Sequence, residues 1–393
     1  KAVLMEHFFE QVETQSELLS STEINHVGEV IKIIGIGGGG CNAVDNMVLS
    51  GVKHVEFICA NTDYKSLIRN KAHHLVQLGK NITKGLGAGT NPEIGEKAAK
   101  EDREKIVSLL KGTDMLFITA GMGGGTGTGA APVIADIAQS MNILTVGVVT
   151  RPFDYEGAKR RKVADVGIEE LRKCVDSLIV IPNEKLVTEL DEDISMRDAF
   201  AAADEVLRNA VAGITEVIKT PGIISLDFAD IRTVMSEGGV AMMGSGTAKG
   251  QNRAREAVEK AIFSPLLDNI SLDGAKGVLV NISANVGSLK TREYHEIIGI
   301  INDHIDPNAD FKPGMAEVED MDDDEIRVTV IATGLHDIHA NNRNVEEMVN
   351  SMNEESDSSS ISKDNQHQQS DDSFSGFNQS SVTSAPAFFR RKR

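Results

Sequence analysis

Two glycine-rich segments have the residue types and spacing that suit phosphate binding. Gly35–Gly40 follows the apolar run Val30–Ile36 and satisfies the pattern G-x-G-x-x-G at a strand-to-helix turn. Gly121–Gly129 also follows an apolar run and precedes a helical segment that contains Pro132. Glycine lets backbone amides approach phosphate oxygens closely, and a helix N-terminus adds partial positive charge. Two such loops suit a chain of phosphates, and a third, Gly85–Thr90, could close over its end.

Two common nucleotide signatures are missing from the sequence. There is no G-x-x-x-x-G-K-[ST] and no Asn-Lys-x-Asp, so the chain is not a P-loop protein and must recognise a base by other residues. One alternative is a nicotinamide-dependent reductase, in which Asp63 would bind the ribose. That alternative offers no role for the second glycine loop.

Apolar runs alternate with helical segments between residues 29 and 196. Asn91, Pro92 and Glu93 predict a capped helix start after the third run. We expect a helix from about Asn42, and this alternation predicts a doubly wound parallel sheet that forms an α/β nucleotide-binding domain. The six predicted strands are Val30–Ile36, Val55–Ala60, His74–Leu78, Met115–Ala120, Ile143–Thr150 and Leu178–Ile181.

A long central helix is predicted over residues 197–219, where apolar side chains recur at helical spacing. Thr220-Pro221-Gly222 should end it. Residues 220–340 predict a second, smaller α/β domain that carries a candidate catalytic loop. Its expected strands are Ala241–Gly244, Val278–Ile282, Ala316–Val318 and Ile326–Ala332. Its expected helices are Arg253–Ser264 and Arg292–Asp303.

The two ends of the chain differ from the rest in composition. Residues 1–28 are polar and irregular and are interpreted as a variable extension. Residues 341–384 are rich in Asn, Ser, Gln and acids, which predicts a disordered linker. Residues 385–393 contain Phe388 and Phe389 followed by four cationic residues, which suggests a docking peptide.

Composition excludes several classes of protein. The chain has 40 basic and 59 acidic residues, a net charge of −19, which argues against general nucleic-acid binding. Its three cysteines form no CxxC pair and its histidines lack metal-type spacing, so no metal site is predicted. No apolar run is long enough to span a bilayer and no signal peptide is evident, so we expect a cytoplasmic protein.

The segment Gly123–Gly129 resembles the tubulin-type signature of the FtsZ family of cell-division GTPases. The resemblance extends from about Glu29 to Gly334, and it includes Asn61-Thr62-Asp63 and Arg232–Met235. It implies a protein that binds GTP or GDP with Mg²⁺ and assembles head-to-tail into filaments at the midcell division ring. The tail Pro386–Arg393 resembles the family's peptide for membrane-tethering partners.

The same resemblance implies a set of site residues. In sites of this family Glu156 and Arg160 would contact the ribose and phosphates, while Asn183 and Asp204 would read the guanine edge and Phe200 would stack on the base. The full set of expected GTP-binding residues is Gly38, Gly39, Gly40, Cys41, Asn42, Ala88, Gly89, Thr90, Gly125, Thr126, Gly127, Glu156, Arg160, Asn183, Phe200 and Asp204.

Ser225–Asp230 resembles the catalytic synergy loop of the family, which makes Asp227 and Asp230 the candidate catalytic residues. The loop follows the long helix, so it should lie at the opposite end of the domain from the chain's own nucleotide and act on a neighbour's GTP. The two carboxylates could orient the attacking water. The family usually has Asn where this chain has Ser225, so a nucleotide-stabilised filament with negligible turnover is a further alternative.

Overall fold

The protein is described here by a computed structural model that defines residues 28–187, 195–219, 224, 226–264, 274–319 and 321–335. The predicted linker and docking peptide, most of the N-terminal extension, and Ser225 lie outside these residues.

The first part of the chain forms the predicted doubly wound sheet. Strands β3, β2, β1, β4, β5 and β6 lie in that order, and all neighbouring pairs are parallel. The order reverses between β1 and β4, so the carboxyl ends of these two strands flank a topological switch point, where α/β proteins bind ligands. The strands are β1 (Ile31–Ile36), β2 (Glu56–Asn61), β3 (His74–Gln77), β4 (Met115–Gly121), β5 (Leu144–Arg151) and β6 (Ser177–Pro182).

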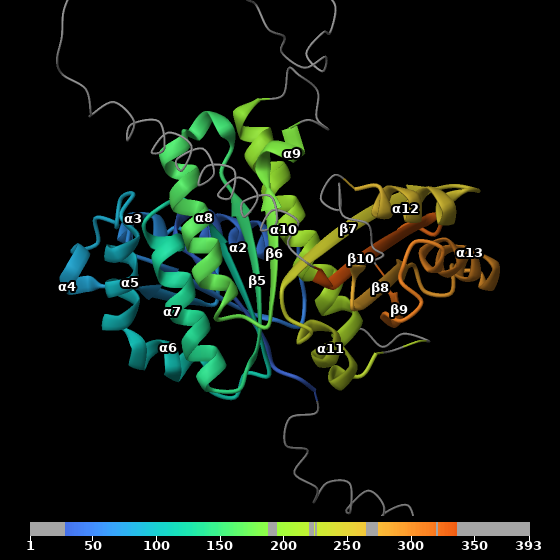
Figure 1. Ribbon diagram of the computed structural model, residues 1–393, viewed down its shortest axis with the longest axis horizontal. Coiled ribbons are helices and arrows are strands. Elements are labelled where there is room, and N and C mark those ends of the chain that lie inside the picture. The colour runs from blue at the N-terminus through green and yellow to red at the C-terminus, as the bar shows by residue number, and fades with distance from the viewer. Residues whose placement is uncertain are drawn as a thin grey trace, which may run out of the picture. The chain divides into compact units, whose positions relative to one another are not determined.

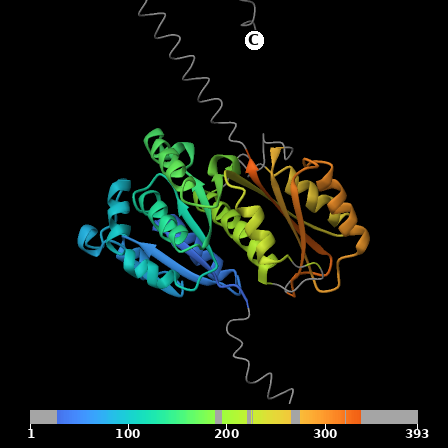
Figure 2. The ribbon, with the colours of Figure 1, turned by 60° about the horizontal axis from the view of Figure 1, so that its bottom comes forward.

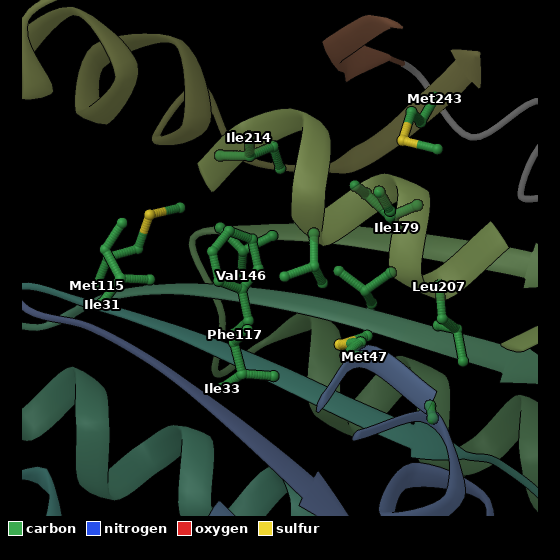
Figure 3. Close-up of a cluster of buried hydrophobic side chains, with 14 of the residues drawn as sticks. Ile31, Ile33, Met47, Met115, Phe117, Val146, Ile179, Leu207, Ile214 and Met243 are labelled. Carbon is green, nitrogen blue, oxygen red and sulfur yellow. The ribbon is translucent and has the colours of Figure 1, made fainter. Parts of the chain in front are cut away.

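Helices cover both faces of this sheet, as its nearly continuous apolar strands require. One core lies between the sheet, α2 (Gly37–Leu49) and α10 (Met196–Lys219), and Figure 3 shows Met47, Phe117 and Leu207 in it. The other core lies beneath α5 (Pro92–Glu101), α6 (Arg103–Leu110), α7 (Thr126–Ser140) and α8 (Ala158–Arg172). Successive residues of a strand therefore alternate between the two cores, on opposite faces of the sheet.

The second part of the chain extends the same sheet instead of forming a separate one. Strand β7 (Val240–Lys249) pairs with β6 in parallel at Leu178↔Val240 and Ile179↔Ala241. The order then continues β10 (Glu325–Leu335), β8 (Gly277–Ala284) and β9 (Asp310–Glu317), with β10 antiparallel to both of its neighbours. Helices α12 (Arg253–Ile262) and α13 (Thr291–Asn302) pack on this part.

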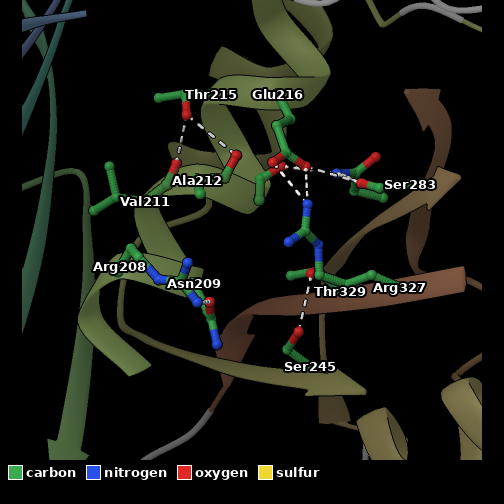
Figure 4. Close-up of polar contacts among 12 residues, drawn as sticks. Arg208, Asn209, Val211, Ala212, Thr215, Glu216, Ser245, Ser283, Arg327 and Thr329 are labelled. Atoms are coloured by element: carbon green, nitrogen blue, oxygen red, sulfur yellow. Dashed lines mark hydrogen bonds and ion pairs between the residues drawn. The ribbon is translucent and has the colours of Figure 1, made fainter. Parts of the chain in front are cut away.

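Helix α10 connects the two parts of the sheet. In Figure 2 it lies, in yellow-green, between the blue-to-green first part and the orange second part. Its Glu216 side chain bonds Arg327 of β10 and Ser283 of β8 (Figure 4). The two predicted domains thus contribute strands to one continuous sheet. The boundary predicted between residues 219 and 220 stays a prediction.

Several element boundaries differ from the prediction. The first helix begins at Gly37 and not near Asn42, so the glycines form its first turn. The strand predicted at Ala316–Val318 spans Asp310–Glu317. Two short helices also occur, α3 (Tyr64–Leu67) between β2 and β3 and α4 (Lys80–Thr83) after β3. The cap before α5 is confirmed, because Asn91 Oδ1 accepts a hydrogen bond of 3.0 Å from the Glu93 amide.

Candidate nucleotide site

A cavity of about 480 Å³ opens at the carboxyl ends of the parallel strands. This volume is in the usual range for a small-molecule site. It lies at the switch point between β1 and β4, beside the first turns of α2 and α7. Twelve predicted residues line it: Gly38, Gly39, Asn42, Gly89, Gly125, Thr126, Gly127, Glu156, Arg160, Asn183, Phe200 and Asp204.

Two helix N-termini face this cavity without side-chain caps. Neither α2, after Ile36, nor α7, after Gly125, has a capping hydrogen bond or an acidic residue in its first turn. The first amides of each helix therefore lack intrahelical partners and carry the positive end of the helix dipole. Both helices exceed ten residues, so the arrangement suits an anion such as a phosphate chain.

Glycine is required where the loops around the cavity touch. Gly37 has φ +71°, and a Cβ there would lie 2.9 Å from the Gly127 nitrogen. A Cβ on Gly125 would lie 2.7 Å from the Gly89 oxygen, which itself accepts a 2.9 Å hydrogen bond from the Gly125 amide. The third loop thus packs directly against the second. By contrast, a Cβ on Gly38 would meet no atom of the described residues within 4 Å, because it would point into open space.

Side chains on η1 (Asp154–Glu156) and α8 form one wall. Arg160 Nη1 lies 3.0 Å from Glu156 Oε2, and Glu156 Oε1 accepts a 3.0 Å hydrogen bond from the Phe153 amide. Phe153 is buried and contacts Phe200 edge-on, with ring centroids 5.2 Å apart. Phe200 is nevertheless 43% exposed, which leaves one of its surfaces open beside the cavity.

Two further polar side chains line the cavity. Asn183 begins α9 (Asn183–Val187) directly after β6, and its buried Oδ1 makes no hydrogen bond with the described residues. Asp204 lies on α10, where Asn46 Nδ2 donates a 2.8 Å hydrogen bond to its Oδ2. Burial raises the pKa of Asp204 to about 6, although the bond from Asn46 opposes this shift. An unpaired amide oxygen and a carboxylate suit a ligand edge that presents hydrogen-bond donors.

Four predicted positions do not line the cavity: Gly40, Cys41, Ala88 and Thr90. Gly40 is packed against the Thr119 carbonyl, which a Cβ would approach to 2.2 Å. The buried Cys41 thiol instead donates to the Gly35 carbonyl at 3.4 Å. Ala88 is buried and Thr90 is exposed, so any role of these four residues in ligand binding stays a prediction.

The sequence did not single out several residues that line the cavity: Thr150, Pro152, Ala203 and Leu207. Thr150 lies at the carboxyl end of β5 and Pro152 directly follows this strand, so their position after an apolar run could have indicated them. Ala203 and Leu207 flank Asp204 on the same side of α10. Thr128 supports the second glycine loop, because its Oγ1 accepts a 2.9 Å hydrogen bond from the Gly123 amide.

The two candidate catalytic acids lie far from this cavity. Asp227 precedes α11 (Phe228–Met235) as its N-cap residue but makes no capping bond with its side chain. Asp230 Oδ1 lies 3.0 Å from Lys312 Nζ on β9, and this contact raises the pKa of Lys312. Helix α10 explains the separation, because Asp204 lines the cavity whereas Lys219 contacts Glu29, just before the amino end of β1. Figure 1 shows α9 near the top of the view and α11 near the bottom.

Comparisons with known proteins decide the family. Residues 30–191 match the model described as "Tubulin/FtsZ family, GTPase domain", and residues 239–336 match "FtsZ family, C-terminal domain". The chain belongs to the FtsZ family. It is 61% identical over 307 residues to the cell division protein FtsZ of Neisseria gonorrhoeae, which covers 78% of each chain. Its identity to the cell division protein FtsZ of Pseudomonas putida is 58% over 306 residues, 78% of this chain and 76% of that one.

Solved structures agree with this assignment. An empty FtsZ dimer from M. jannaschii has a TM-score of 0.75 and 42% identity, covering 82% of this chain and 92% of that chain. This FtsZ-family chain is therefore a GTPase that binds GTP and GDP. The reductase interpretation is wrong. The alternative of a filament with negligible turnover, which depends on Ser225, stays a prediction. None of the helices among the described residues is long and apolar enough to cross a membrane.

Proposed function

We propose that this chain binds GTP in the cavity, assembles head-to-tail and hydrolyses the GTP of one subunit with Asp227 and Asp230 of the next. The filaments would form the division ring at midcell in the cytoplasm. The observation that carries the proposal is the separation of the acids from the chain's own cavity.

The length of α10 sets this separation. From Asp204 to Lys219 the helix rises about 22 Å, at 1.5 Å per residue, and the acidic loop follows its far end. No side chain spans such a distance, so Asp227 and Asp230 cannot reach the same subunit's nucleotide. A second copy placed with its α11 end against the cavity would supply them. Such a contact joins two different surfaces and does not close, so it generates a filament.

From the lining residues we propose where each part of the nucleotide lies in the cavity. The phosphates would lie at the N-termini of α2 and α7, where amides are free and an added Cβ on Gly38 would intrude. Arg160 would contact the phosphates or ribose beside Glu156. The base would lie against Phe200, with its donor edge toward Asp204 and Asn183.

A Mg²⁺ ion would accompany the phosphates and neutralise part of their charge. Across the described residues there is no group of three or more His, Cys, Asp or Glu side chains that could hold a metal ion. We therefore propose that phosphate oxygens and water supply most of its ligands, as is usual for Mg²⁺ with nucleotides.

The last residues of the chain extend the proposal to partners. Pro386–Arg393 would bind a membrane-tethering division protein through Phe388 and Phe389, with the following cations as secondary contacts. No nucleic-acid partner is proposed, because the net charge is −19.

A mixing experiment tests catalysis between subunits. Asp227→Ala keeps the cavity intact, whereas Asp204→Ala keeps the acidic loop intact. Each variant alone should release little phosphate. An equal mixture should recover about a quarter of wild-type turnover, because random head-to-tail assembly pairs an intact cavity with an intact loop at one interface in four.

Sedimentation must show that both variants enter the same polymers. Asp136→Ala, which removes an exposed acid on α7, is the matched control and should keep full activity alone. If copolymers form and no activity returns, the proposal fails. It also fails if a monomer prevented from assembling hydrolyses GTP as fast as the polymer.

A further inference from the structure

A polar contact outside the cavity joins two of the helices that form its walls. Asn46 lies in α2, more than a turn beyond the glycines, and is half-buried. Its Nδ2 donates a hydrogen bond of 2.8 Å to Asp204 Oδ2 on α10. Asp204 lines the cavity, whereas Asn46 does not. The Asp204 carboxylate therefore provides a direct route by which Asn46 can influence a ligand.

Rotation of this carboxylate matters for what it can bind. The terminal torsion of Asp is broad and roughly two-fold, so an unrestrained carboxylate samples many orientations. Guanine presents two adjacent donors, N1–H and the 2-amino group, and a carboxylate accepts both only when its plane matches theirs. The bond from Asn46 fixes one oxygen and hence that plane.

We propose that Asn46 is a positioning residue for base recognition, which orients the Asp204 carboxylate so that it accepts from both donors of guanine and favours bases that carry the 2-amino group. The inference rests on the proposed function of Asp204 in reading the base. It predicts that removing Asn46 reduces discrimination between bases more than it reduces nucleotide binding as a whole.

The surroundings of Asp204 give Asn46 a second effect. Burial raises the pKa of Asp204 to about 6, and the hydrogen bond from Asn46 lowers it. Several charged groups on the same helix and on neighbouring elements have partners of their own. Glu156 pairs with Arg160, Arg208 bonds Glu205 and Asn209, Glu184 accepts from the Asp154 amide, Asp45 accepts from the Lys71 amide, and Lys185 also has a partner. Without Asn46, the carboxylate would therefore protonate at a higher pH.

The test compares GDP with inosine diphosphate, which lacks the 2-amino group. Dissociation constants are measured for both ligands between pH 5.5 and 8.5. For Asn46→Ala we expect GDP affinity at pH 7.5 to fall up to about tenfold, because the freed carboxylate must be ordered when the base binds. Inosine diphosphate affinity should fall less, and the pH at which half of the GDP affinity is lost should rise.

Two further variants keep the result interpretable. Asn46→Asp has nearly the same shape but places a second carboxylate beside Asp204, so it should weaken GDP binding more than Asn46→Ala does. Leu49→Ala, at the exposed end of α2, should behave as wild type. Thermal unfolding checks that all variants fold.

The outcomes separate the inference from the proposed function. If Asp204→Ala loses discrimination but Asn46→Ala keeps the wild-type ratio and pH profile, the inference about Asn46 is wrong and the base-reading role of Asp204 stands. An equal loss of both ligands in Asn46→Ala also overturns it, because that result indicates a merely structural role. If Asp204→Ala leaves the ratio unchanged, both proposals fail.

Discussion

Glu216 and Arg327 are joined by two hydrogen bonds, of 2.8 and 3.0 Å, from one guanidinium nitrogen to the two carboxylate oxygens (Figure 4). Glu216 lies on α10 and Arg327 on β10, so the pair links the long helix to the second part of the sheet. Ser283 on β8 donates a third bond, of 2.9 Å, to the same carboxylate. The helix that lines the cavity is thereby attached to two strands beyond it.

This pair should stabilise the fold measurably. Both side chains are about four-fifths buried, so water competes poorly for them. A double-mutant cycle with Glu216→Gln and Arg327→Met should give a coupling free energy of about 1–3 kcal/mol in urea unfolding. The exposed pair Lys173–Glu170, 2.7 Å apart, is the matched control and should couple by less than about 1 kcal/mol. Equal coupling in the two pairs would contradict this prediction.

Gly38 and Gly40, two positions apart in α2, should respond differently to substitution by alanine. In Gly38→Ala the new Cβ enters open space in the cavity, so the melting temperature should stay within about 2 °C of wild type. GDP affinity should fall at least tenfold, since the methyl group occupies phosphate space. In Gly40→Ala the Cβ would lie 2.2 Å from the Thr119 backbone oxygen, so the fold itself should be lost or strongly destabilised.

Thermal unfolding and GDP titration of both variants check this contrast. A Gly38→Ala protein that binds GDP normally would show that the phosphates do not lie at the α2 N-terminus. A Gly40→Ala protein with wild-type stability would show that the close contact with β4 relaxes without cost.

The sequence predicted the first part of the fold better than the second, for a physical reason. Parallel strands buried on both faces are short apolar runs, so β1 and β4 are visible in the sequence. Strand β9 is at the edge of the sheet and contains Lys312, Pro313 and Gly314, which hide it. The pairing of β6 with β7 involves only two residue pairs and leaves no pattern in the sequence.

The candidate site shows the same distinction. Glycine loops after strands have a local pattern, and those around Gly38 and Gly125 line the cavity as expected. Ala203 and Leu207 line it only because the first half of α10 lies beside the carboxyl ends of the strands. The bond from Asn46 to Asp204 joins residues 158 positions apart, which no local pattern could predict.

The raised pKa of Asp204 predicts opposite effects of pH on stability and on binding. The pKa of this carboxyl rises from 3.8 to about 6 because burial disfavours its charged form. In the ligand-free protein the ionised carboxylate therefore destabilises the fold above about pH 6, and this penalty is relieved as the pH falls from 6 toward 3.8. Guanine binding needs the ionised form, so GDP affinity should decrease over the same fall in pH.

Asp204→Asn separates these effects from those of other titrating groups. In this variant an amide replaces the carboxyl and does not titrate. The unfolding free energy and the weak GDP affinity of the variant should therefore not show the change near pH 6 that Asp204 causes in the wild type. The measurement is chemical unfolding and GDP titration of the wild type and the variant, at half-unit steps from pH 5 to 8. If the wild type binds GDP equally well across this range, Asp204 does not meet the base as a carboxylate with a raised pKa.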